Sequence, residues 1–321
     1  MLHYLPIPLF VLLILTDATA QLTDYEVHFG LTNQSPEQVV LRRWRQDGQA
    51  RFLLLDPQTL ETSVAKLAPE EVRAVAWPVL QRQLTNTAYG QTMLTEKHRD
   101  GQLQDAGIGR ADTTERGFSL TIDLCPSAKP LTRPVFEAII RAFGPEEKPI
   151  PVTITVTGVW MNSHQPDLAY LRSLVSRGDL TITWVNHSYH HRFDPRRPLP
   201  VNFLLEPNTS LADEVLLNEQ AMLQNGLLPS VFFRFPGLVS DKAVFDAVLD
   251  FGLLPIGSDA WLAKEQQPKQ GSFVLIHANG NEPLGITDFI RLIRQKAPSI
   301  KNKTWLLYEL PRSVAAGRGV R

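Results

Sequence analysis

The feature that most constrains the fold is a repeated alternation of apolar strand-like segments and helical segments that begins at residue 118. The strand-like segments cover residues 118–125, 151–161, 179–186, 230–237, 253–259, 272–280 and 303–310. They are apolar on both faces, as parallel strands covered by helices tend to be. The sequence therefore predicts an α/β fold, an incomplete (β/α) barrel, over residues 118–321.

The segments between these strands carry helix signals. An apolar stripe at i, i+3, i+4 and i+7 follows the first strand, formed by Phe136, Ile139, Ile140 and Phe143. Pro166 opens a second helix, and Ser210 with Asp213 forms a weak capping box for another. Helices of this kind can cover the faces of the predicted sheet.

Residues 21–117 show a mixed pattern and predict a small α+β accessory segment. Asp47 and Gly48 form a turn between two strands. Residues 68–84 resemble a helix kinked by Pro78. Residues 85–117 are polar and predict a long connection, or a segment that wraps over the barrel.

The first twenty residues have the pattern of an export signal. An apolar run from Tyr4 to Leu15 precedes Ala18-Thr19-Ala20, a small-x-small site for a signal peptidase. The run is shorter than the roughly 20 residues that a spanning helix needs. We therefore expect residues 1–20 to be cleaved and the mature chain to be periplasmic or secreted, without a stable membrane span. An uncleaved anchor is the alternative.

The charge and cysteine content narrow the classes of partner. A net charge of −1 over 321 residues gives no basic surplus to attract nucleic acid or an anionic membrane. Small neutral or weakly charged substrates fit better. The only cysteine, Cys125, excludes an internal disulfide, and its simplest interpretation is a small buried packing residue.

Polar residues gather where the predicted strands end, which is where a β/α barrel carries its active site. These residues are Asp123, His187, His191, Arg234, Asp259 and His277. His187 and His191 are four apart and could share a metal ion if the chain turns helically there. The alternative for each histidine is a hydrogen-bonded structural role at the end of a strand.

In their order along the chain, these segments resemble the motifs of polysaccharide deacetylases with a NodB homology domain, carbohydrate esterase family 4. The resemblance covers residues 118–310. "LTIDLCPS" resembles the first motif, "NHSYHH" the second, "FRFPG" the third, "SDAW" the fourth and "VLIHA" the fifth. The resemblance implies a distorted barrel of NodB type that hydrolyses acetyl groups.

The resemblance also implies a role for the residues that match the motifs. Asp123 would be the general base, held ionised by Arg234. His187 and His191 would bind a divalent metal, with Zn²⁺ preferred and Co²⁺ or Ni²⁺ as other candidates.

Five further residues complete the implied site. His277 would protonate the leaving amine and would be oriented by Asp259. A backbone N–H near Tyr189 would help to stabilise the oxyanion. Trp261 and Leu275 would form an apolar pocket for the acetyl methyl group.

One position departs from the family pattern. The first motif normally has two successive aspartates, and the second of them binds the metal, whereas this chain has Leu124. A leucine cannot coordinate a metal, so either another side chain replaces the aspartate or the metal is lost. The candidate replacements are Asp123, His164, His190 and Asp194.

The sequence therefore predicts an exported, metal-dependent hydrolase that acts on carbon–nitrogen bonds other than peptide bonds. Its substrate would be an acetylated polysaccharide or oligosaccharide, with N-acetyl groups preferred over O-acetyl groups. One alternative is an amidohydrolase for a different C–N bond. The other is a non-catalytic carbohydrate-binding protein that has kept the barrel and lost the metal.

Overall fold

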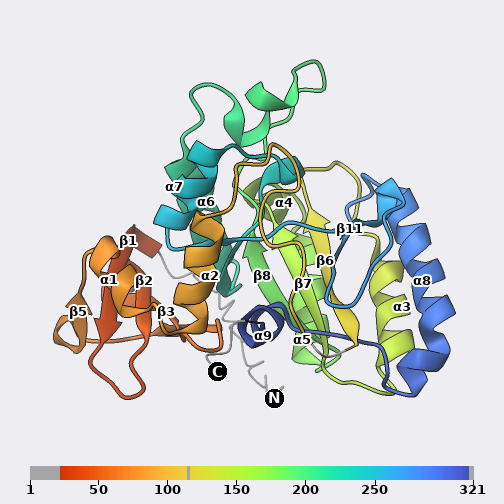
Figure 1. Ribbon diagram of the computed structural model, residues 1–321, viewed down its shortest axis with the longest axis horizontal. Coiled ribbons are helices and arrows are strands. Elements are labelled where there is room, and N and C mark those ends of the chain that lie inside the picture. Colours follow the sequence, from red (N-terminus) through yellow and green to blue (C-terminus); the bar gives the residue numbers. More distant parts are fainter. Residues whose placement is uncertain (1–21, 114–115, 318–321) are drawn as a thin grey trace, which may run out of the picture.

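The computed structural model describes residues 22–113 and 116–317 and contains two β-sheets (Figure 1). The predicted export signal, residues 1–20, lies outside the described residues. Among the residues described, no helix combines the length and the apolar character needed to cross a membrane.

The larger sheet is parallel and curved. Its strands are β6 (Gly117–Leu124), β7 (Ile150–Val156), β8 (Leu180–Asn186), β9 (Pro229–Phe233), β10 (Leu254–Pro255), β11 (Ala260–Trp261), β12 (Phe273–His277) and β13 (Leu306–Leu307). The order is β10-β9-β8-β7-β6-β12-β11, and β13 pairs with β6. This arrangement confirms the predicted distorted (β/α) barrel, with β10 and β11 at its two ends.

Helices cover the sheet as the apolar stripes predict. They are α3 (Arg133–Phe143), α4 (Gly158–Ser163), α5 (Gln165–Ser176), α6 (Leu211–Gln224), α7 (Lys242–Asp250), α8 (Pro283–Lys301) and α9 (Leu310–Ala316). Helices α3 and α8 lie together on one flank of the sheet (Figure 1). Phe136, Ile139 and Phe143 of α3 are fully buried. The side chain of Ser210 caps α6 by accepting a hydrogen bond from the backbone N–H of Asp213.

Short 3-10 helices lie in the connections. They are η1 (Pro69–Glu71), η2 (Leu199–Val201), η3 (Phe203–Leu205), η4 (Pro236–Leu238) and η5 (Leu262–Lys264). Two of them, η3 and η4, contact each other beside the carboxyl ends of the strands.

The N-terminal sheet is antiparallel and lies on the flank opposite α8 (Figure 1). Its strands are β1 (Leu22–Thr32), β2 (Val39–Gln46), β3 (Gln49–Leu55), β4 (Thr62–Ala65) and β5 (Val72–Ala74), followed by α1 (Trp77–Gln83) and α2 (Ala88–Lys97). Asp47 and Gly48 have positive φ angles of 53° and 74°, so they form the predicted hairpin turn between β2 and β3.

The predicted helix over residues 68–84 is wrong in its first half. Residues 72–74 pair with β1, where Gly30 faces Ala74. A side chain at Gly30 would bring Cβ within 2.7 Å of the Arg73 carbonyl oxygen, so glycine permits this close pairing. Tertiary strand pairing overrides the local helical pattern, and α1 starts at Trp77 with Pro78 in its first turn rather than at a kink.

A buried ion pair joins the two sheets through α6. Arg42 of β2 donates from Nε to Glu219 Oε2 at 2.7 Å and from Nη2 to Glu219 Oε1 at 3.0 Å. Tyr25 Oη donates to the same carboxylate at 2.9 Å. The side chains of Arg42 and Glu219 are 0 % and 1 % exposed.

Residues 106–111 lie in the open side of the barrel. Ile108 donates its N–H to the Pro255 carbonyl at 3.0 Å and accepts from Gly257 N at 2.9 Å. On the other side of the segment, Phe273 N donates to the Gly109 carbonyl at 2.9 Å. The segment therefore connects β10 to β12 and wraps onto the barrel, as one of the two predictions for residues 85–117 has it for this part of the range. Residues 88–97 form α2 instead, which neither prediction includes.

Candidate active site

The sheet register brings the predicted strand-end residues to one edge. Asp123 lies opposite His277 on β12 and opposite Thr155 on β7. Asn186 of β8 lies opposite Phe233 of β9, so the next residues, His187 and Arg234, leave the sheet together. Parallel strands place their carboxyl ends side by side, which is why residues far apart in sequence meet here.

Asp123 and Arg234 form a buried ion pair. Arg234 Nη1 lies 3.0 Å from Asp123 Oδ1, and Thr155 Oγ1 donates to the same oxygen at 2.7 Å. Burial on its own raises the pKa of Asp123, but Arg234 and then the nearby imidazoles outweigh it and hold the pKa below its ordinary value. Asp123 is therefore a carboxylate at neutral pH.

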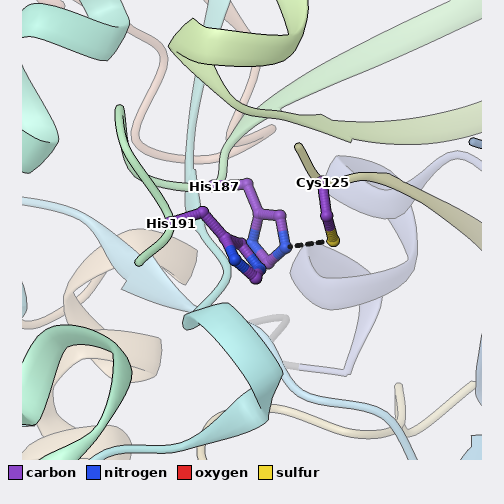
Figure 2. A group of neighbouring side chains, drawn as sticks. All are labelled: Cys125, His187 and His191. Atoms are coloured by element: carbon purple, nitrogen blue, oxygen red, sulfur yellow. Dashed lines mark hydrogen bonds between the residues drawn. The ribbon is translucent and has the colours of Figure 1, made fainter. Parts of the chain in front are cut away.

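A Cys–His–His cluster adjoins this pair, formed by Cys125, His187 and His191 (Figure 2). Cys125 Sγ lies 3.5 Å from His187 Nε2, and one donor atom from each of the three residues lies within 4.8 Å of the others. His187 Nδ1 lies 2.8 Å from the Arg234 carbonyl oxygen. Since a carbonyl only accepts, Nδ1 carries the proton and Nε2 is left to face the cluster.

The cluster fits a divalent metal. His191 Nε2 is buried and finds no hydrogen-bond partner within the described part of the chain, which a metal bond would remedy. Sulfur and imidazole donors are typical of Zn²⁺ and of the metals that replace it, such as Co²⁺. Cys125 supplies the third donor that the pattern of two histidines lacks.

The side chain at position 124 points away from this cluster. Leu124 is fully buried in the core between the sheet and the helices, whereas Asp123 and Cys125 contact the site. Strand residues alternate between faces, so positions 123 and 125 share the site face and position 124 does not. In this chain Cys125, one residue after the expected ligand position 124, contacts the histidines.

Three of the four candidate replacements are engaged elsewhere. Asp194 Oδ1 accepts from Arg196, His190 Nδ1 lies 2.8 Å from Glu214, and His164 Nε2 lies 2.8 Å from the Ser127 carbonyl. The fourth, Asp123, has Oδ2 at 3.7 Å from His187 Nε2, beside the cluster.

His277 has a different carboxylate partner from the expected one. Its Nδ1 lies 2.8 Å from Glu282 Oε2, which also accepts from Trp261 Nε1 at 2.7 Å. Asp259 accepts instead from Arg110 Nε at 2.6 Å, so the expectation that Asp259 orients His277 is wrong. Asp259 precedes β11 and pairs with Arg110 of residues 106–111, whereas Glu282 is the N-cap residue of α8, five residues after the end of β12.

The charge state of His277 follows from its neighbours. Burial on its own lowers the pKa of His277, but Cys125, Glu282 and Asp123 together raise it well above the ordinary value. An imidazolium at neutral pH can donate a proton, which is what a general acid must do.

The predicted apolar residues lie next to His277. Trp261 and Leu275 form a small cluster with Leu238, and the ring centroids of Trp261 and His277 are 5.9 Å apart. Tyr189 is half-buried, and its hydroxyl accepts from Asn162 at 3.0 Å. The role of the Tyr189 backbone N–H stays a prediction.

The loops around the site have strained backbones. Four non-glycine residues adopt left-handed φ angles: Ser188 (66°), His191 (49°), Phe203 (53°) and Leu238 (56°). Residues 187–191 form no helical turn, so these conformations, rather than a helix face, bring His191 against His187 at a ring distance of 4.7 Å. Such strain is costly and typical of functional sites.

Fold and site together define a class of protein: a distorted (β/α) barrel that carries a buried carboxylate–arginine pair, a Cys–His–His cluster and a histidine paired with a glutamate at one strand edge. The resemblance to carbohydrate esterase family 4 recurs among solved structures. A family 4 carbohydrate esterase from Bacillus anthracis is 17 % identical, with 70 % of this chain and 91 % of that chain covered and a TM-score of 0.48. One from Streptomyces lividans, in complex with acetate, is 18 % identical, with 61 % and 94 % covered and a TM-score of 0.43.

A family 4 pseudoenzyme from Bacillus anthracis is also similar, at 15 % identity, with 66 % of this chain and 70 % of that chain covered and a TM-score of 0.43. No family model matches the chain. At these identities and TM-scores the likenesses carry no argument about activity, so the assignment of function rests on the site.

Proposed function

We propose that this protein is an exported, metal-dependent deacetylase that releases acetate from an acetylated polysaccharide or oligosaccharide. One observation carries the proposal: a carboxylate paired with an arginine, a Cys–His–His donor set and a histidine held against Glu282 meet at one strand edge. An amide is a poor electrophile with a poor leaving group. Its hydrolysis therefore benefits from a base, an acid and a Lewis acid acting together.

Each residue then has a chemical task. Asp123, ionised beside Arg234, accepts a proton from the attacking water. His277, held by Glu282, donates a proton to the departing amine nitrogen. The Cys–His–His cluster would hold a divalent metal, which would polarise the acetyl carbonyl.

The apolar cluster of Leu238, Trp261 and Leu275 supports an acetyl substrate. It lies beside His277 and offers a dry surface for a methyl group. Arg234 and Thr155 fix the position of the Asp123 carboxylate, which keeps the base oriented without movement during the reaction.

We also propose that Cys125 is the third metal ligand in place of the absent aspartate. Three protein donors with one open position are the usual pattern of a catalytic zinc site. The Co²⁺-loaded protein should show an intense near-ultraviolet thiolate-to-cobalt absorption band. Cys125→Ser should lose that band and bind Co²⁺ more weakly while its circular dichroism stays unchanged. An identical band in Cys125→Ser would exclude sulfur ligation.

The function is tested by measuring acetate release from N-acetylated and O-acetylated oligosaccharides together with metal content. The wild-type protein should hold about one metal per chain and release acetate, and His187→Ala should lose both because two donors hold a dication poorly. If the wild type loaded with Zn²⁺, Co²⁺ or Ni²⁺ shows neither bound metal nor acetate, the non-catalytic carbohydrate-binding alternative replaces the proposal.

Export and domain organisation belong to the same proposal. Ala18-Thr19-Ala20 supports cleavage before Gln21 and a periplasmic or secreted mature chain. The division into an accessory segment, residues 21–117, and a deacetylase barrel, residues 118–321, is supported by the change from an antiparallel to a parallel sheet. N-terminal sequencing of the protein from its native host tests the cleavage: a mature chain that still begins with Met1 would exclude it.

A further inference from the structure

We propose that Phe193 is a stacking platform for a sugar ring adjacent to the metal cluster, so that the protein binds a glycan of at least two units. The inference rests on the proposed function for the chemical class of the ligand. The position and shape of the platform rest on contacts of this chain alone.

The first observation is exposure. The side chain of Phe193 is 58 % exposed, and it is the one aromatic residue among the exposed large hydrophobic residues of the described ranges 22–113 and 116–317. It follows His191 of the Cys–His–His cluster by two positions. An exposed aromatic ring so close to a candidate active site suggests ligand binding rather than packing.

The second observation is that the ring is held in place from one side. Phe193 stacks on Phe203 with ring centroids 5.0 Å apart and planes inclined by 18°. Phe203 in turn meets the edge of His191 at 5.8 Å and 90°. One face of Phe193 is therefore covered by Phe203, and the chain of rings ties it to the cluster.

The third observation is the close packing of the Phe203 ring against Gly237. Gly237 has φ of +63°, and a Cβ there would lie 2.5 Å from the Phe203 ring. Only glycine allows both the backbone turn and the close approach of this ring. Phe203 itself is only 8 % exposed and has a left-handed backbone conformation. Burial of its ring therefore offsets the strain of this conformation.

Hydrogen bonds from a buried amide side chain stabilise the loop that carries Phe193. Asn202 is 2 % exposed, and its Nδ2 donates to the carbonyls of Asp194 at 2.6 Å and Arg197 at 3.1 Å. Its Oδ1 accepts from Asp194 N at 3.1 Å. A loop ordered before binding costs little entropy when a ligand arrives, which favours affinity.

The uncovered face of the Phe193 ring is chemically suited to a sugar. The face of a pyranose ring carries C–H groups, which pack on the electron-rich face of a flat aromatic ring. In the proposed function the acetyl methyl packs on a separate cluster, Leu238, Trp261 and Leu275, which shares no residue with the platform. Phe193 is therefore available to the sugar next to the one that reacts.

Calorimetric titration of the full, Zn²⁺-loaded chain tests this inference. The probes are the trisaccharide of N-acetylglucosamine, an acetylated xylotriose and the monosaccharide N-acetylglucosamine. Phe193→Ala should weaken trisaccharide binding by roughly tenfold, as expected for losing part of a buried aromatic contact. Phe193→Trp should preserve trisaccharide binding, and the monosaccharide should bind the wild type and Phe193→Ala equally.

The matched control is Leu228→Ala, which trims another exposed apolar side chain (39 %) just before β9, at the amino end of the strands. It should leave all three affinities unchanged, and thermal unfolding should show that each variant is folded.

Two outcomes overturn the inference: equal trisaccharide affinity in Phe193→Ala and the wild type, or no binding of either trisaccharide by the wild type. Failure of the proposed function has a different signature. If the trisaccharide binds in a Phe193-dependent way but no acetate appears, the platform stands and the deacetylase proposal fails. If acetate is released but neither binding nor release depends on Phe193, the deacetylase proposal stands and the platform proposal fails.

Discussion

The ion pair between Arg42 and Glu219 gives a quantitative prediction, because both side chains are almost completely removed from water. Arg42→Met leaves the Glu219 carboxylate buried with only Tyr25 as a donor among the contacts described. Leaving one charge of a buried pair uncompensated destabilises a protein by about 3–5 kcal/mol. Arg42→Met should therefore lose about that much free energy of unfolding.

The double variant Arg42→Met/Glu219→Met distinguishes two free energies: the cost of burying the unpaired Glu219 carboxylate, and the net contribution of the ion pair to stability. It removes both charges and fills the space with apolar atoms, so its stability should return to within about 1–2 kcal/mol of the wild type. The control is Arg43→Met on the same strand. Arg43 and its partner Glu26 are 47 % and 48 % exposed, and such a surface pair contributes less than about 1 kcal/mol.

Urea unfolding followed by tryptophan fluorescence measures all three variants, and an unchanged denaturant slope shows that the same surface unfolds. Helix α6 also holds the strand-end loop: Glu214 accepts from His190 N at 2.8 Å, and Asn218 donates to Asn186 at 2.7 Å. Arg42→Met should therefore also weaken Zn²⁺ binding. A double variant as unstable as the single one, or a loss below 1 kcal/mol in Arg42→Met, would refute this reasoning.

Four further predictions address single residues. Asp123→Asn should keep its metal by elemental analysis and lower acetate release by about 10²–10⁴-fold, as expected for a lost general base; a parallel loss of metal would make Asp123 a ligand. Glu282→Gln removes a negative neighbour that raises the pKa of His277, so the alkaline fall of kcat should move to lower pH; an unchanged profile would exclude this coupling. Gly158→Ala places a Cβ 2.2 Å from a Tyr189 ring carbon and should cost about 1–3 kcal/mol in thermal unfolding; an unchanged Tm would mean that the ring moves freely. Burial raises the pKa of Glu147 to about 7 from 4.5, so its contribution to stability is present below pH 4.5 and is lost as the pH rises to 7. Because Glu147 is only partly buried, the wild type should lose only about 1 kcal/mol relative to Glu147→Gln over that range, and parallel pH curves would contradict this.

The barrel and much of the site could be predicted from the sequence because both follow from local patterns. Strands apolar on both faces require helices on both sides, and parallel strands bring their carboxyl ends together. Asp123, His187, Arg234 and His277 all lie within one residue of a strand end, so their convergence needed no knowledge of the loops.

The parts that could not be predicted depend on contacts between distant segments. The partner of His277 is Glu282, at the start of α8, and no local pattern distinguishes it from Asp259. Cys125 approaches the histidines because side chains alternate between the two faces of the strand, so that positions 123 and 125 share a face. Motif matching places the expected ligand one residue earlier, at position 124. Strand β5 pairs with β1 where Gly30 accepts a neighbour at close range.

The position of residues 106–111 has a consequence for how the chain can be cut. Ile108 and Gly109 occupy backbone groups of Pro255, Gly257 and Phe273 on the two sides of the open barrel. A fragment that starts at residue 118 would expose these groups as two bare strand edges, which pair readily with other chains. The barrel is therefore expected to aggregate when produced alone and to remain soluble when the fragment starts before residue 106. A comparison of the two fragments by light scattering would measure the difference.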